Sequence, residues 1–149
     1  MPTDTDADGE LLLLDTSVAI ALVVEDHEAH AAALEAVHGR RLGLAGHAWF
    51  EAYSVLTRLP GTRRRSPADA LRLLAHDFPA SRFLGEDESR ALGLEIARLG
   101  ISGGAVYDAL VGAAARQHRA PLVSADGRAR PVYEALGVEL GLLRTQTGI

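Results

Sequence analysis

The stretch that decides the fold is Leu11-Leu12-Leu13-Leu14-Asp15-Thr16-Ser17. Four consecutive leucines show no alternation with polar residues, which is typical of a strand buried on both faces of a parallel sheet. Thr16 and Ser17 can cap a helix that begins near Val18, so the strand is expected to run directly into a helix. Asp15 therefore ends the strand, at the edge where open α/β sheets place their ligand sites.

The rest of the chain alternates between short apolar segments and helical patterns. This alternation predicts a single α/β domain with a mostly parallel sheet. Further strands are expected at 41–45, 82–84, 121–124 and 138–140. Helices are expected at 28–37, 47–59, 67–76, 87–99, 105–117 and 131–136. We expect a mobile acidic leader over residues 1–10, the folded domain over 11–142 and a C-terminal tail over 143–149.

Composition excludes several kinds of chemistry. The chain has 149 residues, of which 48% are hydrophobic and 23% charged, as expected for one globular domain. All 15 of its lysine-or-arginine positions are arginine, which excludes Walker-A phosphate binding and lysine Schiff bases. There is no cysteine, which excludes thiol nucleophiles, disulfides and thiolate metal sites. Carboxylates, histidines and hydroxyls remain as reactive groups.

The net charge and the length of the apolar segments indicate where the protein is expected to act. The formal net charge is −5, so no overall positive field favours nucleic acid. The longest apolar runs are far shorter than the roughly 20 residues that span a bilayer, and no signal peptide is visible. A cytoplasmic protein is therefore expected.

Two acidic residues follow expected strands. Asp15 ends the leucine strand, and Asp126 comes two residues after the strand expected at 121–124. The carboxyl ends of parallel strands lie at one edge of a sheet, so we expect these two side chains to lie near each other. The simpler interpretations are that Asp15 only caps the next helix and that Asp126 is a turn residue before Gly127.

Two more acids lie near the starts of expected helices. Asp108 is the only charged residue in the stretch 105–115, and a helix that is apolar all round is a buried one. Glu51 shares a narrow polar stripe with Ser54 and Arg58. The alternatives are a buried arginine partner for Asp108 and a plain solvent-facing position for Glu51.

Four carboxylates in one place repel one another. They can coexist only by taking up protons or by binding divalent cations, and oxygen-only ligands select Mg²⁺ or Mn²⁺. Such ions activate water and stabilise the leaving oxygen in phosphodiester cleavage. The four acids therefore indicate a metal-dependent nuclease if the fold brings them together.

The chain resembles the PIN-domain ribonucleases, and among them the VapC toxins of bacterial toxin–antitoxin pairs. Each matching segment carries one acid, and the order and spacing agree across residues 11–142. The segments are Leu12-Leu13-Leu14-Asp15-Thr16-Ser17-Val18, Phe50-Glu51-Ala52-Tyr53-Ser54-Val55-Leu56, Tyr107-Asp108-Ala109-Leu110-Val111 and Leu122-Val123-Ser124-Ala125-Asp126. The family often has threonine where Ser124 stands, and serine keeps the hydroxyl.

The resemblance implies a PIN-like domain with a five-stranded parallel sheet and helices on both faces. It implies that Asp15, Glu51, Asp108 and Asp126 form a catalytic metal site for Mg²⁺ or Mn²⁺, with Thr16, Ser17 and Ser124 orienting the carboxylates. It also implies endonucleolytic cleavage of cellular RNA, such as tRNA or rRNA, together with homodimerisation and inhibition by a cognate antitoxin.

Two questions stay open on the sequence alone. Arg58, Arg63, Arg64 and Arg65 form a basic cluster that could contact RNA, but a solvated loop or a contact with the antitoxin or a second copy fits equally. A catalytically silent PIN-like module that keeps the partner complex without cleaving RNA is the alternative function, and the presence of all four acids favours the nuclease.

Overall fold

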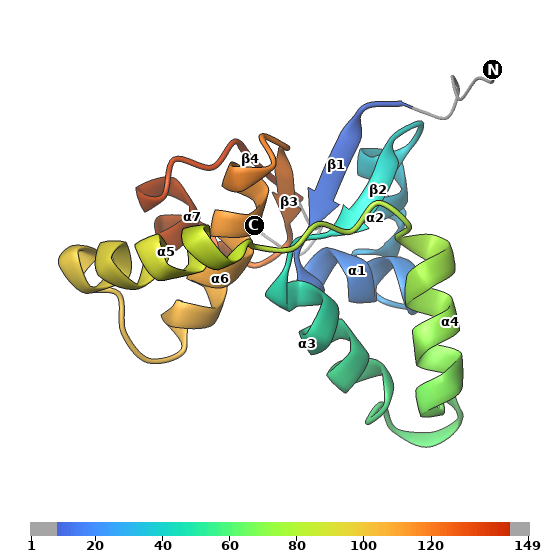
Figure 1. Cartoon of the computed structure of the whole chain (residues 1–149). Helices are drawn as coiled ribbons and strands as arrows, with labels where there is room; N and C mark the ends of the chain where they lie inside the picture. Colours follow the sequence, from blue (N-terminus) through green and yellow to red (C-terminus); the bar gives the residue numbers. More distant parts are fainter. Residues whose placement is uncertain (1–8, 144–149) are drawn as a thin grey trace, which may run out of the picture.

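A four-stranded parallel sheet forms the centre of the protein, and the computed structural model describes residues 9–143 of the chain (Figure 1). The strands are β1 (Leu11–Leu14), β2 (Arg41–Leu44), β3 (Leu122–Ser124) and β4 (Leu140–Leu142). They lie in the order β2-β1-β3-β4, and every pairing is parallel. The predicted α/β class and parallel sheet are confirmed.

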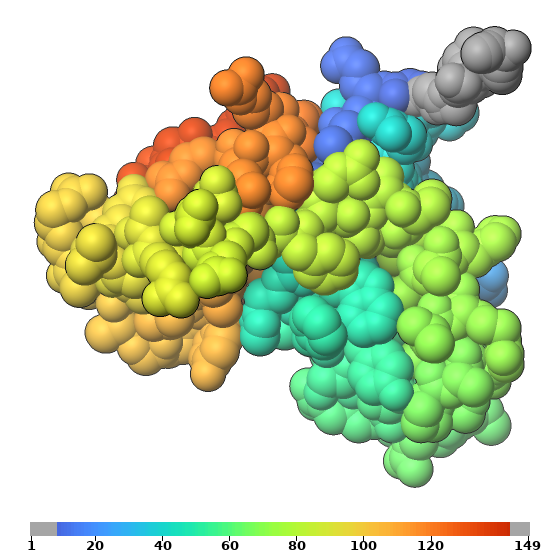
Figure 2. Space-filling model, viewed as in Figure 1, coloured from blue at the N-terminus to red at the C-terminus, as the bar shows by residue number. Residues whose placement is uncertain are grey.

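Helices connect the strands. They are α1 (Thr16–Val23), α2 (His30–Val37), α3 (His47–Leu56), α4 (Pro67–Asp77), α5 (Glu86–Leu99), α6 (Ala105–Gln117) and α7 (Arg130–Ala135), with 3-10 turns η2 (Gly61–Arg63) and η3 (Gly127–Ala129). Helices α5, α6 and α7 gather beside β3 and β4, whereas α3 and α4 project together from the other half of the sheet (Figure 1). Between these two groups the surface is hollowed (Figure 2). No helix within residues 9–143 combines the length and the apolar character needed to cross a bilayer.

The leucine strand is the middle of the core. Leu12, Leu13 and Leu14 are at most 2% exposed. Because neighbouring side chains of a strand point to opposite faces, their burial means that helices cover both faces of the sheet. Val18 on α1 and Leu122 on β3 are fully buried in the same cluster.

The prediction of a fifth strand at 82–84 is wrong. Arg82 forms a single parallel bridge with Ala45, so this segment is not a strand. The reason lies one residue earlier. The Leu44 amide donates to the Ser81 hydroxyl at 2.9 Å, where a ladder would use a backbone carbonyl. Backbone bonds from Ala80 to Leu42, from Arg82 to Leu44 and from Gly46 to Arg82 still tie this segment to the end of β2, but the interruption at Ser81 leaves a single bridge.

The last strand and the third helix also differ from the prediction at their ends. Strand β4 begins at residue 140 rather than 138, because the Val138 amide donates to the Tyr133 carbonyl in the cap of α7. Gly137 adopts the left-handed conformation that this cap requires, with φ of 75°. Helix α3 ends at Leu56 rather than 59. Most of the expected leader and tail lies outside the described residues.

Candidate active site

One small pocket lies where β1 and β3 end, and all four predicted acids line it. Its volume is about 120 Å³. The lining residues, called the acid pocket below, are Asp15, Thr16, Ser17, Glu51, Asp108, Val111, Asp126 and Tyr133. Asp15 and Asp126 follow β1 and β3, and Glu51 and Asp108 come from α3 and α6. The fold therefore brings together side chains that lie more than one hundred positions apart in the sequence.

Asp15 is the most buried of the four acids, with 4% of its surface exposed. Its Oδ1 accepts hydrogen bonds from the Ser17 hydroxyl at 2.5 Å and the Val18 amide at 3.4 Å. Its Oδ2 accepts a hydrogen bond from the Tyr133 hydroxyl at 3.0 Å. Burial raises the pKa of Asp15, and hydroxyl bonds from Ser124, Ser17 and Tyr133 oppose that rise. Asp15 caps α1 and also lines the pocket, so the cap is not its only position of interest.

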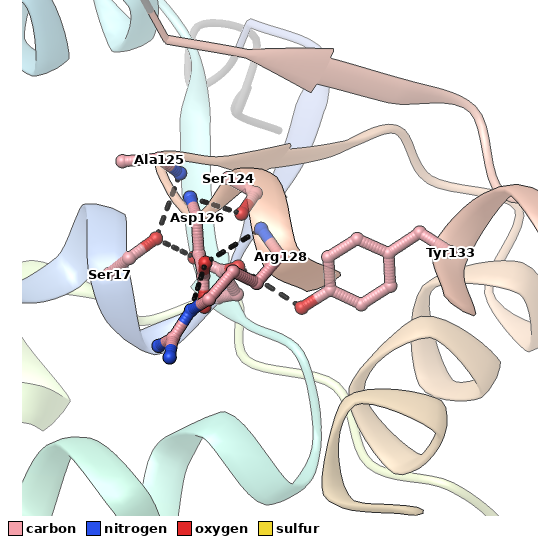
Figure 3. A network of polar contacts seen from close by, with 7 residues as sticks. Ser17, Ser124, Ala125, Asp126, Arg128 and Tyr133 are labelled. Atoms are coloured by element: carbon pink, nitrogen blue, oxygen red, sulfur yellow. Dashed lines mark hydrogen bonds and ion pairs between the residues drawn. The ribbon is translucent and has the colours of Figure 1, made fainter. Parts of the chain in front are cut away.

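Three hydroxyl groups form hydrogen bonds around the acid pocket. Ser17 donates to Asp15 and accepts from the Ala125 amide at 2.8 Å, which ties the start of α1 to the end of β3 (Figure 3). The fully buried Ser124 accepts from the Asp126 amide at 3.0 Å. Thr16 donates to Glu51 Oε1 at 3.0 Å. Each of these three hydroxyls thus contacts one of the four acids or its backbone.

Asp108 carries the clearest sign of uncompensated charge. Burial, followed by the negative charges of Asp126, Glu51 and Asp15, raises the pKa of this carboxyl to about 6. The positive charge of Arg128 lowers the pKa of Asp108, but by less than burial and the neighbouring carboxylates raise it. The alternative of a buried arginine partner for Asp108 is therefore not what the structure shows, because within residues 9–143 no arginine forms an ion pair with it.

Asp126 is partly neutralised. Its Oδ1 accepts from the Arg128 amide at 2.9 Å and from Arg128 Nε at 3.4 Å, and in this way it caps η3 (Figure 3). The Arg128 side chain is 94% exposed, so solvent screens this ion pair. The turn role and the pocket position of Asp126 coexist.

The donors of the acid pocket suit a hard divalent cation. All polar side chains that line it offer oxygen, a ligand set that favours Mg²⁺ or Mn²⁺ over softer metals. Within the described part of the chain, no three histidine or acidic side chains are already placed to share one ion. Burial and the neighbouring carboxylates raise the pKa of Asp108, and a divalent cation in the pocket would lower this electrostatic cost.

The sequence did not point to two residues that lie near the four acids. Tyr133 is buried and donates to Asp15, and His47 has its Nε2 4.0 Å from Glu51 Oε2. Within the described range, Tyr133 and Ser124 are the only polar residues among the largest fully buried side chains. No local pattern distinguishes it in the sequence, because its contact with Asp15 spans 118 positions.

The basic cluster lies away from the acid pocket. Arg63 pairs with Asp26, and Arg58 Nε donates to Ser54 at 3.4 Å. Arg63 and Arg65 line a different pocket with the end of α1, of about 420 Å³, whereas none of the four arginines lines the acid pocket. A role in binding RNA or a partner protein thus remains a prediction.

In chelator, the free energy of unfolding is expected to fall as the pH rises from about 4 to about 6. The Asp108 carboxyl has a pKa of about 6 in the folded protein against an ordinary value of 3.8, so the folded state binds more protons in this window. Urea denaturation across this range measures the fall, and Asp108→Asn should show a shallower one. The exposed Asp69 and the half-buried Glu95, whose pKa values arginine partners lower, contribute at the acid end of this range and below it, and they are unchanged in both proteins. Equal slopes in the two proteins would contradict the assignment.

Comparisons with known proteins agree with this geometry. The family model for the PIN domain matches residues 12–135. Ribonuclease VapC27 of Mycobacterium tuberculosis (strain ATCC 25618 / H37Rv) is 49% identical over 129 residues, covering 87% of this chain and 94% of the relative. Ribonuclease VapC40 of Mycobacterium tuberculosis (strain CDC 1551 / Oshkosh) is 43% identical over 131 residues, covering 87% of this chain and 96% of the relative.

A solved structure shares the fold. The crystal structure of VapBC2 from Rickettsia felis, bound to a DNA fragment from its promoter, contains a chain that superposes with a TM-score of 0.61 at 13% identity. The match covers 90% of this chain and 99% of that one. The family match over most of the chain and the two close relatives show that the chain belongs to the PIN domain family, as a protein of the VapC type.

Proposed function

We propose that this protein is a metal-dependent endoribonuclease that acts as the toxin of a toxin–antitoxin pair. The observation that carries the proposal is the acid pocket, in which four carboxylates from four separate segments meet and leave Asp108 with uncompensated charge. The names of the two mycobacterial relatives, both ribonucleases, support the choice of RNA as substrate.

Asp15 and Asp108 are assigned as direct ligands of Mg²⁺ or Mn²⁺. Glu51 and Asp126 complete the site directly or through water, since Mg²⁺ usually keeps several waters. A bound divalent ion supplies a more acidic water and a positive charge at the departing oxygen of the phosphodiester.

The protein's own contribution is to hold the carboxylates. Asp15 Oδ2 accepts the Tyr133 bond, which holds this carboxylate oxygen at the edge of the pocket. The bonds from Ser17 and Val18 to Oδ1 fix the plane of the same carboxylate. Thr16 orients Glu51 in the same manner, and loss of such supporting bonds commonly costs 10- to 100-fold in metal affinity or activity.

The proposed partners follow from the VapC resemblance. They are a cognate antitoxin that inhibits the protein, an RNA substrate such as tRNA or rRNA, and a second copy of the chain in a homodimer. Light scattering of the purified protein measures the last of these directly.

Cleavage of mixed cellular RNA tests the nuclease proposal. Wild-type protein freed of its partner should cleave RNA with Mg²⁺ or Mn²⁺ and stop when chelator is added. Asp108→Asn, purified in parallel, should be at least about 100-fold slower because one ligand and one charge are lost. Equal cleavage by the two proteins would point to a contaminating nuclease. Absence of cleavage by the wild type, with the antitoxin complex intact, would favour the catalytically silent module.

A further inference from the structure

Two aromatic rings stack beside the acid pocket. The rings of His47 and Tyr107 lie 5.0 Å apart between centroids with an angle of 22° between their planes. His47 is the first residue of α3, four positions before Glu51, and Tyr107 on α6 directly precedes Asp108. Tyr107 is nevertheless 51% exposed. The pair therefore joins the two helices that supply Glu51 and Asp108, with a tyrosine ring open to solvent.

The two rings meet where the start of α3 packs closely on α6. The start of α3 already contacts α6 closely, because a Cβ at Gly46 would lie 3.0 Å from the Ala114 Cβ and 3.7 Å from the Leu110 carbonyl oxygen. His47 covers one face of the Tyr107 ring, so the exposed part includes the other face. A large ring with one face covered and the other open to solvent is the arrangement on which proteins stack unpaired bases.

Charge makes such a contact useful at this site. The acid pocket repels a phosphate backbone, the net charge of the chain is −5, and the basic cluster lies elsewhere. Stacking between a base and an aromatic ring depends little on the charges around it, so it can hold RNA where electrostatic attraction is weak. A base in a duplex has both faces covered by its neighbours, so only an unpaired base can use the ring.

We propose that Tyr107, backed by His47, is a stacking platform for one unpaired RNA base next to the phosphate that is cleaved. The proposal rests on the nuclease function and adds to it a residue that positions the RNA base beside the cleaved bond.

Binding of a short fluorescent RNA tests the platform without cleavage. The measurement uses the Asp108→Asn protein, in which the RNA is expected to stay intact. In this background Tyr107→Ala should weaken binding of single-stranded RNA by about tenfold or more, whereas Tyr107→Phe, which keeps the ring, should bind like the parent. The slope of log Kd against log salt should be the same for all three, because no phosphate contact is lost. The same RNA annealed to its complement should bind equally weakly to all three.

Phe83→Ala is the matched control. Phe83 is 47% exposed, close to the 51% of Tyr107, but its ring lies against Phe50 instead of beside the acid pocket. This control should bind RNA like the parent. Unchanged binding by Tyr107→Ala, or a parent protein that binds no single-stranded RNA, would overturn the platform. A change in oligomeric state on Tyr107→Ala would also overturn it, by assigning the ring to a contact between copies. Normal platform behaviour combined with absence of cleavage by wild-type protein would instead contradict only the nuclease function.

Discussion

Adding Mn²⁺ to wild-type protein at neutral pH is expected to raise the melting temperature by about 8 °C, and Asp15→Asn and Asp108→Asn are expected to lose this rise. A ligand that binds only the folded state stabilises it by about 2.7 kcal/mol at 100 times its Kd. In a domain of this size that corresponds to a shift of several degrees. The cation also relieves the repulsion that raises the pKa of Asp108. Differential scanning fluorimetry with and without chelator measures the shift.

Each variant must be compared with its own melting temperature in chelator. Asn at position 15 places an amide donor where the carboxylate accepted bonds from Ser17 and Tyr133, so this variant should start less stable. Asn at position 108 removes a repelled charge and should start at or above the wild type. Asp87→Asn, an exposed acid in the first turn of α5, is the matched control and should keep the full rise. A full rise in Asp108→Asn would contradict the metal site.

Gly43→Ala is expected to destabilise the protein by about 3 kcal/mol or more. Gly43 lies in the middle of β2, and a Cβ there would lie 2.2 Å from the Ala80 carbonyl carbon and oxygen and 2.4 Å from the Ser81 nitrogen. These are backbone atoms that no side-chain rotation can move aside, so the segment must shift away from the sheet. The bonds from the Ala80 amide to the Leu42 carbonyl and from the Leu44 amide to the Ser81 hydroxyl are then lost. The urea midpoint of unfolding measures the effect.

Gly93→Ala is the control for the intrinsic effect of the substitution. Gly93 lies within α5, and nothing lies within 4 Å of a Cβ built on it. Alanine should therefore stabilise the helix by about 0.5–1 kcal/mol. If Gly43→Ala were as stable as wild type, residues 80–82 would not lie against β2 as described.

Local patterns were enough to predict the elements that bury a continuous apolar surface. A few neighbouring residues are enough to identify three such features. They are the strand formed by the four leucines, the start of α4 at Pro67 and the isolated Asp108 in the apolar helix α6. The fifth strand failed for a reason that no local pattern carries. Residues 80–82, which reach only the first residue of the strand expected at 82–84, do lie along β2, but a serine hydroxyl replaces one backbone acceptor in the ladder.

The sequence by itself indicated the fold class and singled out the four acids that line the pocket. Burying an unpaired charge or exposing four consecutive leucines costs free energy, and the neighbouring residues already show which positions face that cost. Only the tertiary structure decided which groups surround those acids. Tyr133 reaches Asp15 across 118 positions, and His47 meets Tyr107 across a helix pair. These contacts depend on how helices pack against the sheet, and packing of this kind leaves no periodic signal in the chain.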